Sequence, residues 1–252
     1  MAEYMKNQIQ KENEIVACVG SSTAAAHGVF NWLKELEKRP QNSRFTFVNR
    51  GVGGDVAYST LQRLPKTITL HPDRVILIIG ANDILNQVFP NVQKMLGGWK
   101  RLPEKSSPKW FRENLTAIVN ELQAKTSARI GLVSLALVGE DPNSSNPKQA
   151  ELNKLFAEFA KIIKHVAQQE GVDYIPFYER FEEQLMTDPG KAFTEFRFRS
   201  FFRDYYWREF IRRRTFDEIA KMNGWKYHVD GVHLNTRGGM ILADAIQEFL
   251  DK

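Results

Sequence analysis

The sequence predicts an α/β protein of the doubly wound, flavodoxin-like type, with helices on both faces of a five-stranded parallel sheet. Three observations support this prediction. Five short apolar runs rich in β-branched residues occur along the chain, segments with helical spacing alternate with them, and 42% of the 252 residues are hydrophobic. Strands that alternate with helices form a parallel sheet between two helix layers. The length fits one large domain or two small ones, and we expect one, residues 1–252.

Each expected strand is a run with an aliphatic or aromatic centre. The runs are Ile15–Val19, Phe45–Val48, Arg74–Ile79, Arg129–Leu135 and Val172–Ile175. The third has an unbroken Val-Ile-Leu-Ile-Ile centre, which is typical of a parallel strand buried on both faces. In open parallel sheets, ligands bind beyond the carboxyl ends of the strands. The loop after each strand is therefore a candidate site.

The expected helices lie between and after these strands. They are Ala24–Glu37, Ala57–Thr67, Trp110–Ala124, Pro147–Gln169 and Arg237–Leu250. Their apolar residues recur at helical spacing, which indicates that one side of each helix packs on the sheet.

Composition excludes several classes of protein. The single cysteine, Cys18, lies in the first apolar run, so no disulfide forms within the chain and we expect a core thiol. Cys and His do not occur at zinc-ligand spacing, and we expect no metal. Met1–Glu14 is polar, without the apolar core of a signal peptide, and no apolar run is long enough to span a bilayer. We therefore expect a soluble, cytoplasmic protein.

Three loops that follow strands carry small or polar residues. Gly20-Ser21-Ser22 follows the first strand, and Ser22 is either a nucleophile or an ordinary turn and helix cap. Asn49–Asp55 follows the second strand, and its glycines either expose backbone N–H groups or form a tight turn. This loop lacks the spacing of a dinucleotide fingerprint and the ending of a P-loop. Asn82, after the third strand, either caps a helix or donates its amide into a cleft.

A fourth candidate loop, Val229–Asn235, precedes the last helix. Asp230 and His233 stand three residues apart, so the carboxylate can meet one ring nitrogen and leave the other to act as a base. His228 competes for this role, and a capped turn with a surface histidine is the alternative. The remaining histidines, His27, His71 and His165, have no acidic partner at a comparable spacing and are expected to be structural.

Together the four loops resemble the SGNH hydrolase superfamily, which contains the GDSL-type esterases and lipases. The blocks are Gly20-Ser21-Ser22, Gly54 in the glycine loop, Gly80-Ala81-Asn82-Asp83, and Asp230-Gly231-Val232-His233. Their order and spacing agree with the family over nearly the whole chain. One position departs from the family pattern, because Ser21 stands where the family has Asp before the nucleophile. This replacement puts the support of the nucleophile turn in doubt.

The resemblance implies a three-layer α/β/α fold and a role for each residue. Ser22 would be the nucleophile, His233 the base, and Asp230 the group that orients His233. The backbone N–H groups of Ser22 and Gly54 and the side-chain amide of Asn82 would form the oxyanion hole. Asp83 is expected to brace its loop, and neither a cofactor nor a metal is expected.

An insertion, residues 178–226, separates the last strand from the Asp-His block. Phe193–Phe216 within it is rich in aromatic residues, and Phe196–Arg214 holds seven arginines, which contribute to a net charge of +5. The apolar residues form two stripes or a bend rather than one amphipathic helix. Three interpretations remain open: packing on the domain or a second subunit, a lid over the site, or peripheral membrane contact through residues 193–216.

The predicted function is a serine esterase or lipase that hydrolyses a carboxylic ester through an acyl-enzyme. The substrate is an acyl lipid, a small acyl ester or an O-acetyl sugar, and the aromatic insertion favours an apolar acyl group. One alternative is an acyltransferase with the same triad. The other is a non-catalytic module that binds membrane or nucleic acid, although we expect no nucleic-acid partner. The oligomeric state is not predicted.

Overall fold

The computed structural model describes residues 13–26, 30–197 and 213–252, and it contains one parallel sheet of five strands. The strands are β1 (Glu14–Gly20), β2 (Phe45–Gly51), β3 (Arg74–Ile78), β4 (Arg129–Val133) and β5 (Asp173–Ile175). All neighbouring pairs are parallel, in the order β2-β1-β3-β4-β5. This is the flavodoxin-like order, in which strands are added to one side of β1 and then, from β3 on, to its other side. The predicted fold class is confirmed.

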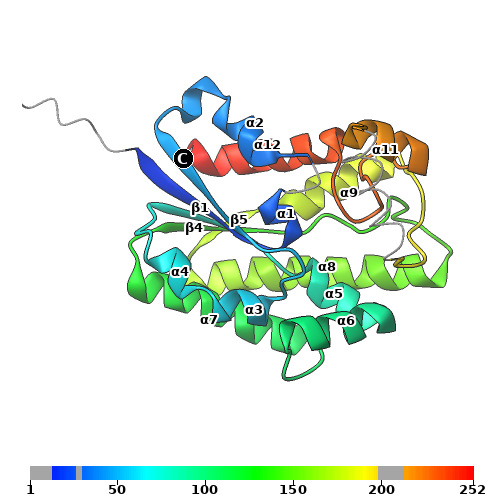
Figure 1. Ribbon diagram of the computed structural model, residues 1–252, viewed down its shortest axis with the longest axis horizontal. Helices are drawn as coiled ribbons and strands as arrows, with labels where there is room; N and C mark the ends of the chain where they lie inside the picture. The colour runs from blue at the N-terminus through cyan, green and yellow to red at the C-terminus, as the bar shows by residue number, and fades with distance from the viewer. Residues whose placement is uncertain (1–12, 27–29, 198–212) are drawn as a thin grey trace, which may run out of the picture.

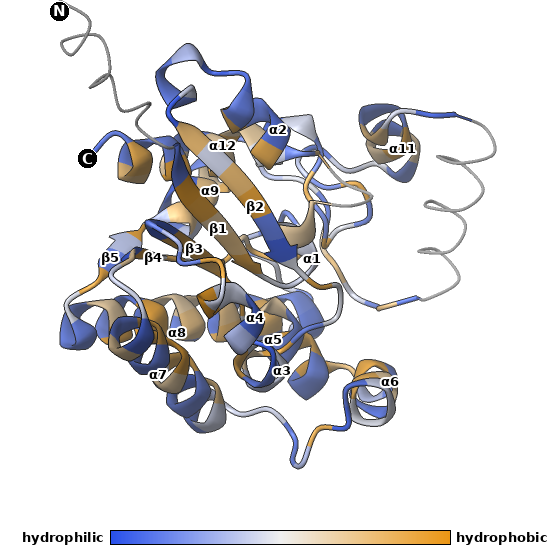
Figure 2. Ribbon diagram, turned by 60° about the vertical axis from the view of Figure 1, so that its left-hand side comes forward, coloured by the Kyte–Doolittle hydropathy of each residue, from blue (hydrophilic) through white to orange (hydrophobic). Residues whose placement is uncertain are grey.

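Helices cover both faces of the sheet (Figure 1). One layer holds α2 (Trp32–Glu37), α9 (Phe177–Thr187) and α12 (Thr236–Leu250), and the other holds α3 (Ala57–Gln62), α7 (Pro108–Lys125) and α8 (Pro147–Glu170). The apolar strands lie between them, as the colouring of β1 shows in Figure 2. Val75, Ile76 and Leu77 of β3 are buried, as both faces of a covered parallel strand require.

The helix predicted over Ala24–Glu37 is wrong as a single element. A short helix, α1 (Ser22–Ala25), ends where Ala26 adopts a left-handed conformation with φ +50°. The chain then enters α2 separately, where the Asn31 side chain accepts a hydrogen bond from the Lys34 N–H. Such a cap starts a new helix. Both helices bury apolar residues, Ala24 and Ala25 in α1 and Trp32, Leu33 and Leu36 in α2.

The helix predicted over Ala57–Thr67 also divides. The helix α3 ends at Gln62, and α4 (Pro65–Ile68) begins at a proline. Proline has no N–H to continue a helix but fits the first position of a new one. Within the described ranges, four further helices are missing from the prediction: α5 (Ala81–Val88), α6 (Pro90–Lys100), α9, and α11 (Phe216–Asn223). A 3₁₀ turn at Pro40–Asn42 precedes β2.

The insertion is helical at both described ends, with α9 on one side and α11 on the other. Phe193 is buried among aromatic rings, with centroids 5.8 Å from Phe89 and 6.3 Å from Trp225. This part of the segment therefore packs on the domain. Residues 198–212 lie outside the described residues, so the lid and the membrane contact stay predictions. None of the helices in the described ranges is long and apolar enough to cross a membrane.

Candidate active site

The nucleophile candidate, Ser22, is the first residue of α1 and lies at the carboxyl end of β1. Gly20 ends this strand with φ +143°, and a Cβ atom there would stand 1.9 Å from the Ile78 carbonyl oxygen of β3. Only glycine permits this approach of the two strands. Ser21, at the position of the family Asp, is buried, and its N–H donates to the Ile78 carbonyl. Its side chain does not cap α1.

The Asp230–His233 loop is a tight turn closed by backbone bonds. The Val229 N–H donates to the His233 carbonyl at 2.7 Å, and His228 pairs with Leu234 as an antiparallel bridge. Inside the turn, Asp230 Oδ1 accepts hydrogen bonds from the N–H groups of Val232 and His233. A carboxylate that bonds to backbone two and three residues on fixes its own direction. The turn thereby directs the second carboxylate oxygen to the His233 ring.

The three candidate residues form one chain of contacts. Asp230 Oδ2 lies 2.8 Å from His233 Nδ1, and His233 Nε2 lies 3.1 Å from Ser22 Oγ. An ionised carboxylate accepts, so Nδ1 carries the proton and Nε2 presents a lone pair to the serine hydroxyl. This is the tautomer that lets a histidine take a proton from serine. The structure thus brings together all three residues that the sequence selected.

The charges of this pair favour an ionised Asp230 and a basic His233. Burial raises the pKa of Asp230, but the charge and hydrogen bonds of His233 outweigh burial and hold this pKa below its ordinary value. Burial lowers the pKa of His233, but the charge of Asp230 and its hydrogen bond outweigh burial and raise it above the ordinary value. The aspartate therefore strengthens the base that faces Ser22.

The two other donors expected for an oxyanion hole lie beyond the carboxyl ends of β2 and β3. Asn82 lies in the first turn of α5, not in a loop, and its amide nitrogen donates to the Asp55 carbonyl at 3.0 Å. The amide carries a second N–H for another acceptor. Gly54 adopts φ +75°, a left-handed conformation suited to glycine. A Cβ atom on Gly54 would stand 2.4 Å from the ring of Trp99.

Asp83, which we expected to brace its own loop, lies within α5 and bonds to the first residue of α3. It is fully buried in α5, and its carboxyl group accepts from the Ala57 N–H at 3.1 Å. Burial raises the pKa of Asp83 to about 8, although the hydrogen bond from Ala57 opposes this rise in part. This rise favours the protonated form of Asp83 in the folded protein at neutral pH.

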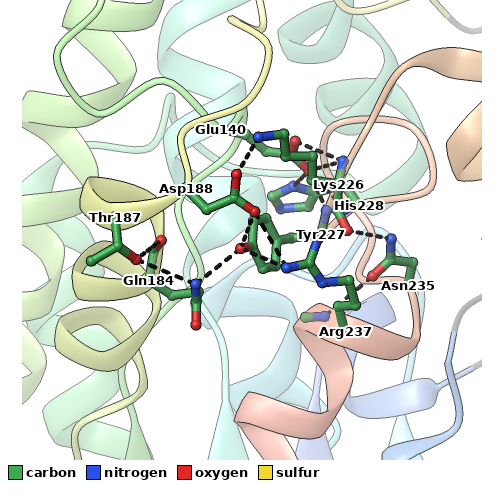
Figure 3. A network of polar contacts seen from close by, with 10 residues as sticks. Glu140, Gln184, Thr187, Asp188, Lys226, Tyr227, His228, Asn235 and Arg237 are labelled. Carbon is green, nitrogen blue, oxygen red and sulfur yellow. Dashed lines mark hydrogen bonds and ion pairs between the residues drawn. The ribbon is translucent and has the colours of Figure 1, made fainter.

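His228 contacts a buried carboxylate, Glu140, which the sequence analysis did not select. Glu140 accepts from the N–H groups of Lys226, Tyr227 and His228, and its Oε1 lies 3.1 Å from His228 Nδ1 (Figure 3). Burial raises the pKa of Glu140, but His228 and the backbone donors outweigh it and keep that pKa below its ordinary value. Glu140 thus anchors the segment that leads into the Asp230–His233 turn.

Two of the other histidines lie at exposed positions of the described residues. His71 is exposed in a turn with φ +48°, and His165 is exposed on α8. His27 lies outside the described residues. In the described ranges, no three His, Cys, Asp or Glu side chains are grouped closely enough to hold a metal ion.

Comparisons with known proteins identify the family and similar folds. The model of the GDSL-like lipase/acylhydrolase family matches residues 14–239. The fold is similar to an acetylxylan esterase from Geobacillus stearothermophilus, with a TM-score of 0.65, 17% identity and 94% of each chain covered. It is also similar to an α/β hydrolase, LAE5, from the metagenome of Lake Arreo, Spain. For LAE5 the TM-score is 0.63, the identity is 16%, and 93% of this chain and 94% of that one are covered. None of the curated proteins compared with the chain matches it.

The family match spans most of the chain and includes every residue of the Ser22, Asp230 and His233 arrangement. The protein therefore belongs to the GDSL-like lipase/acylhydrolase family and is a carboxylic ester hydrolase.

Proposed function

We propose that this protein is a serine esterase that hydrolyses its ester through an acyl-enzyme on Ser22. The observation that carries the proposal is the unbroken contact from Asp230 through His233 to the Ser22 hydroxyl, at 2.8 and 3.1 Å. A serine hydroxyl is a weak nucleophile until an adjacent base removes its proton. The contact supplies that base in the required tautomer.

In the first half of the reaction, Ser22 Oγ attacks the ester carbonyl carbon while its proton passes to His233 Nε2. The carbonyl oxygen takes the negative charge, for which the Asn82 amide and the N–H groups of Ser22 and Gly54 are the proposed donors. The C–O bond to the alcohol then breaks. His233 returns its proton to the leaving oxygen, so an alcohol departs and the acyl group stays on Ser22.

In the second half, His233 removes a proton from water as the water oxygen attacks the acyl carbon. The bond to Ser22 Oγ breaks, and the serine recovers the proton from His233. A carboxylic acid is released, and the protein returns to its starting state. Throughout, the ionised Asp230 stabilises the positive charge that His233 carries transiently.

For the substrate we propose short acyl esters, with O-acetylated saccharides as the first natural class to test. The protein of similar fold from Geobacillus stearothermophilus is an acetylxylan esterase, which supports this choice. Trp99 supports it too, because its ring lies against Gly54 and keeps 60% of the residue surface exposed. An open aromatic ring beside the proposed oxyanion donors can pack against the apolar face of a bound ester.

The test is hydrolysis of p-nitrophenyl esters from acetate to laurate and of acetylated xylooligosaccharides, with wild type and Ser22→Ala compared. We expect acetate to be among the best substrates, and Ser22→Ala to lose activity on every ester. An intact acyl-enzyme mass on Ser22, trapped by acid quench, would locate the acyl group. Equal rates in both proteins would remove Ser22 from the mechanism, and an optimum at long chains would refute the short acyl substrate.

A further inference from the structure

Arg63 makes contact with the loops that carry the nucleophile and the proposed oxyanion donors. It follows α3, and its side chain is 20% exposed. Its Nη2 donates to the Gly20 carbonyl at 2.8 Å, and its Nη1 donates to the Arg50 carbonyl at 2.6 Å. Its Nε donates to Asp55 Oδ2 at 2.5 Å. One planar guanidinium therefore joins the ends of β1 and β2 to the loop beyond Gly54.

Two of these partners, Gly20 and Asp55, lie within two residues of a proposed reacting group. Gly20 is two residues before Ser22, and its carbonyl also accepts from the Val52 N–H at 2.9 Å. Asp55 directly follows Gly54, and its own carbonyl receives the Asn82 amide. A shift of the guanidinium would therefore move the serine relative to the donors that face its substrate.

The carboxylate of Asp55 binds Arg63 and a second cation. It is 3% exposed and also accepts from Lys100 Nζ at 2.7 Å. Two cations thus share one buried anion. Removal of a partner from a buried carboxylate is costly, so the pairing holds the loop firmly. Lys100 is bonded only to the carboxylate in this group, whereas Arg63 also reaches the two backbone carbonyls.

We propose that Arg63 is a positioning residue of the esterase, which sets the Ser22 hydroxyl and the oxyanion donors in one relative geometry. This inference rests on the proposed function. Arg63 does not touch the substrate, and its effect passes through the backbone of Gly20, Arg50 and Asp55. A displacement of reacting groups by about 1 Å can lower a rate by about 10²-fold.

The matched variants are Arg63→Lys and Lys100→Met. The first keeps the positive charge but cannot make all three hydrogen bonds of the guanidinium, and the second removes the other cation that contacts Asp55. We expect Arg63→Lys to lower kcat by about 10²-fold on p-nitrophenyl acetate while KM changes by less than about threefold. Lys100→Met should lower kcat much less, because both backbone carbonyls keep their donor. Circular dichroism and thermal unfolding confirm that the compared proteins are folded.

Chemical rescue separates positioning from a general loss of stability. Guanidinium chloride, well below unfolding concentrations, should restore part of the kcat of Arg63→Ala, and sodium chloride at equal ionic strength should not. Where Arg63→Ala does not fold, the comparison of Arg63→Lys with Lys100→Met decides. A folded Arg63→Lys with wild-type kcat, or an equal kcat loss in Lys100→Met, would overturn the proposal. Ser22→Ala is measured in the same series, and activity that survives in it overturns the proposed function, and the inference with it.

Discussion

Replacement of Asp83 by asparagine should change how the stability of the protein depends on pH. Burial raises the pKa of Asp83 from 3.8 to about 8 in the folded state. Between these values the folded protein keeps a proton that the unfolded chain has released. The stability that protonated Asp83 contributes is fully present below the unfolded pKa, and it is lost as pH rises through the folded pKa. The asparagine of the variant has no such proton, and its amide oxygen can still accept from the Ala57 N–H.

The magnitude follows from the proton count. One proton retained on folding lowers the free energy of unfolding by about 1.4 kcal/mol for each unit of rising pH. Wild type should therefore lose roughly 3 kcal/mol relative to Asp83→Asn between pH 5 and pH 7. The difference should level off above about pH 8, where the folded-state carboxyl group also ionises. All other titrating groups are shared by the two proteins and cancel in the comparison.

The assay is urea unfolding followed by circular dichroism at a series of pH values from 5 to 9. Glu183→Gln is the matched control, because it removes one carboxylate from an exposed position of α9. This control shows whether the loss of a surface carboxylate alone changes the pH dependence of stability. If Asp83→Asn also runs parallel to wild type from pH 5 to pH 7, Asp83 is ionised in the folded protein and the reasoning fails.

Three further predictions concern single residues. Asp230→Asn should lower kcat by about 10³–10⁴-fold. It should also move the acid limb of the kcat/KM profile to lower pH, because the carboxylate raises the pKa of His233; a limb that stays in place would contradict this coupling. Asn82→Ala should lower kcat by about 10²–10³-fold on a short-chain ester, and a rate near wild type would remove its amide from the oxyanion hole. Burial raises the pKa of the Cys18 thiol, so mass spectrometry should find no alkylation by iodoacetamide at pH 8 until urea is added, and labelling of the native protein would show that the thiol is accessible.

The sheet could be predicted because its signal is local. The Val-Ile-Leu-Ile-Ile run of β3 is apolar at every position, and only a strand covered on both faces accommodates that pattern at this length. The helix ends were less predictable. Helical spacing continues through Ala26, and the break depends on a left-handed residue and a new cap at Asn31 rather than on a change of pattern. Asn82 was expected in the loop after the third strand. In the structure it lies in α5, which begins shortly after β3 ends.

The residues of the proposed triad differ in how they could be predicted. Asp230 and His233 are three residues apart, so a single turn brings them together and the spacing alone indicates the contact. Ser22 lies 211 residues before His233. It could be selected for two reasons. The carboxyl ends of parallel strands lie at one edge of the sheet, and four sequence blocks in order resemble a known family. Its 3.1 Å distance from the histidine comes from the fold.

By itself, the sequence determined the parallel sheet, the edge where the site lies, and the residues Ser22, Asp230 and His233. The sheet follows from periodicity and the pairing of Asp230 with His233 from a short spacing, whereas the choice of Ser22 rests mainly on the family resemblance. Only the tertiary structure decided the supports of the site. Glu140 meets His228 across 88 residues, and Arg63 meets Gly20 across 43. No sequence pattern around Glu140 or Arg63 indicates its partner. A buried charge pairs with the donors and acceptors that tertiary packing places beside it.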